Sequence, residues 1–127
     1  MDIAELQKTT VAIGLRVIRV CESLPDDWHA RALGRELLRC GTTIGAHFRA
    51  VARAKTPSSM SARIEHVEEA ADDTLYWLDL ISLAGIVPAS RLRSLVAELE
   101  KLEQQLESII ASLRRRRAAP RIKAAAA

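Results

Sequence analysis

The stretch LRSLVAELEKLEQQLESIIASL, residues 92–113, decides the fold class of this chain of 127 residues. Its apolar residues recur at spacings of three and four, which places them in one stripe along an α-helix. The stripe comprises Leu92, Leu95, Leu99, Leu102, Leu106, Ile109 and Leu113. A helix with such a stripe buries it against other helices, so the rest of the chain has to supply the partners.

Three earlier segments show the same helical periodicity, and short sequences that contain proline separate the segments. The breaks are SLPDD (residues 23–27), KTPSS (55–59) and AGIVP (84–88). In the second break, Thr56 is the predicted N-cap and Pro57 the first helical residue, where proline is well tolerated. No segment shows the strict alternation of a half-buried strand, so the chain predicts only helices.

These features predict an all-α protein, an up-down-up-down four-helix bundle in one domain over residues 1–117. The helices are expected at about residues 2–23, 27–54, 57–84 and 88–117. Residues 118–127 are expected to form a flexible basic and alanine-rich tail, because Pro120 should break the last helix.

The positive charge of the chain is concentrated at one end. Residues 1–113 carry 13 basic and 16 acidic side chains, whereas residues 114–127 carry six basic side chains and no acid. The net charge of +3 is therefore a property of the C-terminal segment. A globally basic body, the simplest sign of a nucleic-acid-binding protein, is absent from the sequence.

The sequence contains neither a long apolar run nor a signal-peptide pattern, so we expect no membrane association and no export. Cys21 and Cys40 lie in helical segments without the spacing of a metal site. We therefore expect both cysteines to be reduced packing residues of a cytoplasmic protein.

One face of the second predicted helix is rich in arginine. At about 100° per residue, its arginines fall within about a quarter of the circumference, opposite the apolar residues. Four more arginines follow at the end of the last helix. The predicted nucleic-acid-binding residues are Arg31, Arg35, Arg39, Arg49, Arg53, Arg114, Arg115, Arg116 and Arg117. A solvated charged face is the alternative interpretation of the same pattern.

The helix predicted over residues 57–84 has a second apolar surface. Opposite its core side, the N-terminal half carries carboxylates, and the C-terminal half replaces them with apolar and aromatic side chains. A four-helix bundle gives each helix one inner face, so the second surface predicts contact with another subunit. The predicted oligomer-interface residues are Tyr76, Trp77, Leu80 and Leu83. Tyr76 and Trp77 would then serve different partners.

The sequence shows no catalytic or metal-binding pattern. A di-iron bundle requires Glu-x-x-His pairs on two helices, and this chain has none. His47 and Cys40 share one side of their helix but lie two turns apart, which favours a packing histidine over a general base. We therefore predict a non-enzymatic protein with no catalytic residues, no metal and no cofactor.

The segment TTIGAHFRAVARAKTPSSMSARIEHVEEAADDTLYWLDLI, residues 42–81, resembles the bacterial four-helix-bundle family found in intervening sequences of ribosomal RNA genes. That family includes the accessory variability determinant of diversity-generating retroelements. The residues that match its motif are Ile44, Ala46, Arg49, Arg53, Ser58, Ser59, Ala71, Thr74, Tyr76, Trp77 and Leu78. The chain departs from the motif at His47, Glu69, Ala70 and Asp73.

The resemblance implies a ring-shaped homopentamer. In the retroelement branch of the family it also implies binding of RNA or DNA and a partner reverse transcriptase in mutagenic retrohoming. The alternative is an oligomeric scaffold, or a ribosomal-RNA-associated protein, without a polymerase partner. In a further alternative, the arginines of the second predicted helix pair with the carboxylates on helix 57–84 of a neighbouring subunit.

Overall fold

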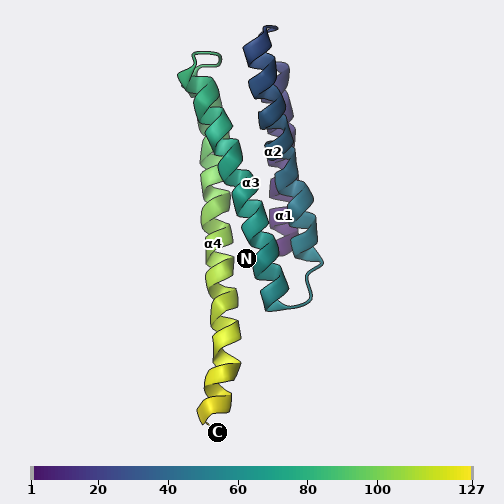
Figure 1. Cartoon of the computed structure of the whole chain (residues 1–127), viewed down its shortest axis with the longest axis vertical. Helices are drawn as coiled ribbons and strands as arrows, with labels where there is room; N and C mark the ends of the chain where they lie inside the picture. Colours follow the sequence, from purple (N-terminus) through teal and green to yellow (C-terminus); the bar gives the residue numbers. More distant parts are fainter. Residues whose placement is uncertain (1, 127) are drawn as a thin grey trace.

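A computed structural model describes the backbone of residues 2–126 and the side chains of residues 2–116. Within this part the chain forms four helices and no strand: α1 (Ile3–Glu22), α2 (Trp28–Ala52), α3 (Pro57–Leu83) and α4 (Ala89–Ala126). Successive helices run antiparallel and lie side by side, with the connections at alternate ends (Figure 1). The protein is therefore an all-α, four-helix bundle. The first three helices begin and end within two residues of the predicted ranges.

Side chains cap the first three helices at their N-termini. Asp2, Asp27 and Thr56 each accept a hydrogen bond from a backbone N–H of the first turn, at 3.0–3.1 Å. Pro57 follows Thr56 as the first residue of α3, as predicted. Each cap satisfies a backbone donor that the helix itself leaves unpaired.

Gly85 ends α3 in a left-handed conformation. Its φ angle is +74°, which side chains other than glycine rarely adopt. The N–H of Gly85 donates to the carbonyl of Ser82, and the N–H of Ile86 donates to the carbonyl of Ile81. This pair of bonds is a Schellman motif, which turns the chain sharply into α4.

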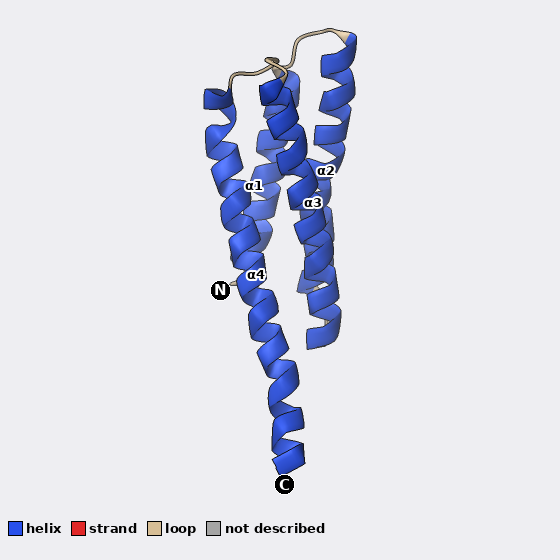
Figure 2. Cartoon of the chain, turned by 60° about the vertical axis from the view of Figure 1, so that its left-hand side comes forward, coloured by secondary structure: helices blue, strands red, loops and turns tan. Residues whose placement is uncertain are grey.

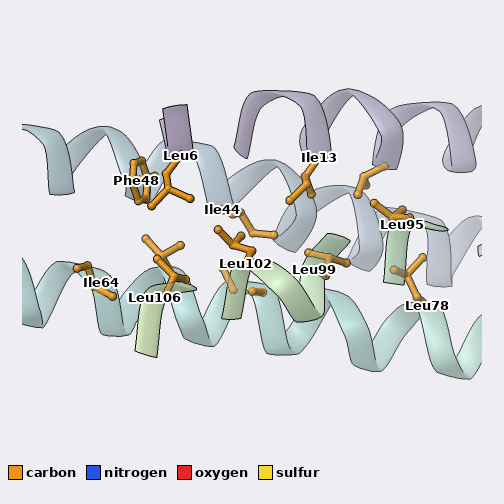
Figure 3. Packing of buried hydrophobic residues seen from close by; sticks show 14 of the residues in the cluster. Leu6, Ile13, Ile44, Phe48, Ile64, Leu78, Leu95, Leu99, Leu102 and Leu106 are labelled. Carbon is orange, nitrogen blue, oxygen red and sulfur yellow. The ribbon is translucent and has the colours of Figure 1, made fainter. Parts of the chain in front are cut away.

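The core runs along the bundle axis between the four helices. Figure 3 shows side chains from all four helices pointing into one shared interior. The apolar stripe that starts at Leu92 lies in this interior, with one shift in its last turns: Ile110 is 6 % exposed, whereas Ile109 is half-buried. A straight helix drifts by about 20° per heptad from a 3.5-residue repeat, and over three heptads this drift turns Ile110 inward.

Glycines bring α1 and α2 close together. A Cβ atom added to Gly41 would lie 2.7 Å from both Cγ atoms of Val17. Gly45 packs against Thr10. A Cβ atom added to Gly45 would lie 3.6 Å or more from the atoms of Thr10. The absence of side chains at the two glycines therefore lets α1 approach α2 closely.

The contact between α1 and α4 is the loosest between neighbouring helices. An ion pair crosses it, because the Arg16 guanidinium lies 2.9 Å from the Glu98 carboxylate. This ion pair places Arg16 and Glu98 at similar levels along the bundle.

The backbone of α4 continues to Ala126, well beyond the predicted end of the helix at residue 117. The prediction that Pro120 breaks the helix is therefore wrong. Proline removes one backbone hydrogen bond, but Ala118 and Ala119 precede it and alanines follow from residue 124, and alanine has the highest helix propensity. Figure 2 shows that this end of α4 projects beyond the other three helices. None of the described helices is long and apolar enough to cross a bilayer.

Candidate nucleic-acid and subunit interfaces

The arginine stripe of α2 comprises Arg31, Arg35, Arg39, Arg49 and Arg53. All five side chains are exposed and follow the outer side of the helix over its whole length. Two of them have acidic partners: Arg31 pairs with Asp26, and Arg39 lies 3.0 Å from Glu36. The three that make no ion pair with a described residue are Arg35, Arg49 and Arg53. Most of the stripe is therefore available to an external anion.

Two apolar side chains accompany the arginine stripe. Trp28, at the first residue of α2, is 76 % exposed and makes an edge-to-face contact with His29, with ring centroids 5.5 Å apart. Leu38 is 39 % exposed. One indole at the end of a row of guanidinium groups offers a single platform on which a base can stack.

The C-terminal arginines lie at the end of the bundle that holds the α2–α3 connection. Arg115 and Arg116 line a shallow hollow together with Ile3 and Met60, and the side chains of Arg114, Arg115 and Arg116 are exposed. Arg117 belongs to α4, but its side chain lies outside the described residues. Arg53, the last residue of the stripe, adjoins the same connection. Arg53 and the C-terminal arginines therefore lie at the same end of the bundle, on helices α2 and α4, whose described backbones do not contact each other.

The four predicted interface residues divide into two pairs. Tyr76 and Leu83 are 58 % and 77 % exposed, whereas Leu80 and Trp77 are half-buried. The Trp77 side chain packs against the core cluster, and its ring makes an edge-to-face contact with Tyr76 at a centroid distance of 5.0 Å. Trp77 thus contributes to its own subunit, and Tyr76 presents its ring to the outside.

A groove of about 700 Å³ opens beside Tyr76, between α3 and α4. Leu75, Tyr76, Leu92 and Val96 supply its apolar surface. The polar residues at its rim are Asp72, Asp79, Ser82, Arg93, Glu100 and Glu103. We call this surface the α3–α4 groove. It is apolar at its centre, acidic at the end near Glu103 and carries a cation, Arg93, near the other end.

A second apolar surface lies on α1 and has no counterpart among the predicted site residues. Val11 and Leu15 are 56 % and 54 % exposed and line a shallow hollow with Ala4 and Lys8. Ile18, half-buried, continues the row. We call Ala4, Lys8, Val11, Leu15 and Ile18 the α1 face. Their spacing of four, three, four and three is itself a helical stripe, parallel to the core stripe and detectable in the sequence.

Carboxylates crowd the acidic end of the groove. Burial, together with the charges of Asp72 and Glu107, raises the pKa of Glu103 above its usual value. Burial and the charge of Glu107 raise the pKa of Glu68 in the same way. The subunit therefore holds like charges there that an external cation would stabilise. Among the described residues, no three His, Cys, Asp or Glu side chains cluster so as to hold a metal ion.

The structure separates the histidine and the cysteine that share one side of α2. The Cys40 thiol is buried and donates to the carbonyl of Leu37, and burial raises the pKa of Cys40. The half-buried His47 faces His66 of α3 instead, with ring centroids 5.7 Å apart. Both Cys21 and Cys40 are free thiols. A buried thiol with a raised pKa is a poor nucleophile, as expected for a packing residue.

These features define a four-helix bundle with an arginine-rich outer helix and two uncovered apolar surfaces. Neither the known protein-family models nor the curated proteins include a match to this chain. Among solved structures, the chain is similar to a protein of unknown function from the S23 ribosomal protein family of Bacteroides thetaiotaomicron. The two share 21 % sequence identity at a TM-score of 0.80, over 87 % of this chain and 99 % of the other. This likeness shows a common fold.

Proposed function

We propose that this chain is a non-enzymatic, oligomeric, nucleic-acid-binding accessory protein of the cytoplasm. The observation that best supports the proposal is the arginine stripe of α2. From Arg31 to Arg53 it spans 22 residues, or about 33 Å at 1.5 Å per residue. This length is close to one turn of a nucleic-acid duplex, about 34 Å, so several phosphates lie within reach.

The resemblance of residues 42–81 to the retroelement accessory proteins supports a more specific role. In that role the protein acts with a reverse transcriptase in mutagenic retrohoming, as a ring-shaped homopentamer that brings template RNA and polymerase together. A reverse transcriptase gene next to this one, with paired template and variable repeats, would be the genomic sign of this partnership.

The alternative is an oligomeric scaffold or a ribosomal-RNA-associated protein without a polymerase partner. The likeness to a member of the S23 ribosomal protein family favours this alternative, because the name of that family refers to the ribosome. Co-expression with a retroelement reverse transcriptase encoded beside this gene distinguishes the two: a stable complex supports the retroelement role, and two separate proteins support the alternative.

Nucleic-acid binding is tested by fluorescence anisotropy with several unrelated RNA and DNA fragments over a range of salt concentrations. Arg49→Glu/Arg53→Glu should lower the affinity about equally for all fragments, because phosphate contacts carry no sequence information. The slope of log affinity against log salt should fall by about two, roughly one for each lost phosphate contact. The matched control is Arg91→Glu/Lys101→Glu, which makes the same charge change on exposed residues of α4 and should bind like the wild type.

A third variant that lacks residues 114–127 separates the stripe from the C-terminal arginines. If only this deletion lowers the affinity, the C-terminal segment is the binding element and the stripe is not. If neither change affects binding at low salt, the nucleic-acid hypothesis is wrong and a protein-only scaffold replaces it.

A further inference from the structure

Two apolar surfaces of the subunit are left uncovered by its own fold. One is the α1 face, which lies about 150° around the helix from buried Val17 and therefore points away from the bundle. The other is the α3–α4 groove, with exposed Tyr76 at its edge. Uncovered apolar surfaces of this kind mark sites of protein contact.

The two surfaces have similar lengths. From Ala4 to Ile18, the α1 face covers 14 residues, or about 21 Å of helix. From Ala89 to Glu103, the α4 side of the groove also covers 14 residues and about 21 Å. At the levels that the Arg16–Glu98 ion pair sets, the two surfaces overlap over about 10 Å, from Glu103 to Ile18.

The charges on the two surfaces are complementary at matching levels. Arg16 and Glu98 lie at similar levels, and α1 and α4 run in opposite directions. At 1.5 Å per residue, Ile18 is then level with Val96, about 3 Å from that reference point, within the apolar part of the groove. Leu15, about 1.5 Å on the other side of that point, and Ile18 therefore lie level with the groove, whereas Val11, at about 7.5 Å, is level with Glu103.

The charged residues coincide in the same way. Measured along the bundle axis, Lys8 lies about 12 Å from the level of Arg16. On the same side of that level, Glu103 lies at about 7.5 Å and Glu107 at about 13.5 Å. At the opposite end, Glu22 lies about 9 Å from that level, close to Arg93 at about 7.5 Å. Rotation about an axis parallel to the bundle preserves these levels, so Lys8, which pairs with Glu5 in its own subunit, and Glu22, which pairs with Arg19, would each approach opposite charges on a neighbouring copy.

We propose that the α1 face of one copy packs into the α3–α4 groove of the next, so that copies join head to tail. The contact is heterologous, and repetition with a closing rotation makes a ring. Parallel pairing of groove with groove is disfavoured, because it would set the carboxylates of Asp72, Glu100 and Glu103 against those of a second copy. This inference rests on the proposed oligomeric function and assigns its interface.

The test uses two variants, each of which damages one surface. Leu15→Glu changes the α1 face and leaves the groove intact, whereas Tyr76→Glu changes the groove and leaves the α1 face intact. Both residues are more than half exposed, so the subunits should keep the wild-type helix content by circular dichroism. Light scattering should give a mass near the 14.0 kDa of one chain for each variant alone, and a multiple of it for the wild type.

Mixing the two variants at about 100 μM tests the head-to-tail geometry. The intact α1 face of Tyr76→Glu should enter the intact groove of Leu15→Glu, so the mixture should contain a complex of two chains. An interface of like surfaces would instead leave one variant assembled on its own, because its intact surface would pair with the same surface of a second copy. The control Leu38→Glu introduces the same charge at an exposed apolar residue of α2 and should keep the wild-type mass.

Each other outcome overturns a defined part of the reasoning. A wild-type mass of 14.0 kDa refutes the oligomeric function, whatever the variants do. If the wild type is an oligomer and both variants keep its mass, this interface is refuted, whereas the oligomeric function is not. Loss of assembly on Arg49→Glu/Arg53→Glu alone would instead assign the interface to the arginine stripe.

Discussion

The close contact between α1 and α2 makes a sharp prediction about Gly41. In Gly41→Ala the new methyl group would lie 2.7 Å from both Cγ atoms of Val17 and 3.0 Å from its Cβ atom. A β-branched side chain in a helix has one favoured rotamer, so Val17 cannot turn away, and the helices have to separate. Overpacking of this kind costs about 1–3 kcal/mol, against which alanine gains about 1 kcal/mol over glycine in helix propensity.

Gly45→Ala is the matched control, because it adds the same methyl group to the same helix. Its nearest neighbours would be atoms of Thr10 at 3.6 Å, an ordinary van der Waals distance. The propensity gain applies to both variants, so Gly41→Ala should be less stable than Gly45→Ala by about 1–3 kcal/mol. Urea denaturation followed by circular dichroism at one fixed protein concentration measures this difference.

The double variant Val17→Ala/Gly41→Ala tests whether the clash is the cause. Removing the two Cγ atoms makes room for the methyl group, so the double variant should be more stable than the sum of the single changes by at least about 0.5 kcal/mol. Equal stability of Gly41→Ala and Gly45→Ala, or strict additivity in the double variant, would refute the packing that we describe.

Three further substitutions test other features of the fold. Thr56→Ala removes the hydroxyl that accepts from the N–H of Ser59 at 3.0 Å, and should lower the free energy of unfolding by about 1 kcal/mol in urea titrations. Gly85→Ala, at a φ angle of +74°, should lower the melting temperature, and Gly85→Asn should lower it less, because asparagine tolerates this conformation better. Glu103→Gln, made in the Leu15→Glu background so that the groove stays empty, should raise the melting temperature at pH 7. Since the folded state raises the pKa of Glu103, the ionised carboxylate destabilises the fold. The gain in melting temperature should therefore disappear as the pH falls to 4.5, the ordinary pKa of glutamate. A gain that persists at that pH would contradict this cause.

Local patterns determined most of the fold. Apolar spacings of three and four predicted each helix, and Thr56, Pro57 and Gly85 marked their ends. These signals are readable because a helix is a local structure, in which caps and periodicity act within a few residues. The exposure of the arginine stripe was predictable for the same reason, since it lies opposite the apolar residues of its own helix.

The tertiary structure decided which surfaces stay uncovered. Periodicity assigned Trp77 to an outer interface, but packing of α3 against its neighbours half-buries this side chain in its own subunit. Sequence reasoning missed the α1 face, although its stripe is visible, because one helix alone does not show which of two stripes meets the bundle. Burial depends on helices distant in the sequence, here on α2 approaching α1 at Gly41, so only the packed bundle leaves Val11 and Leu15 exposed.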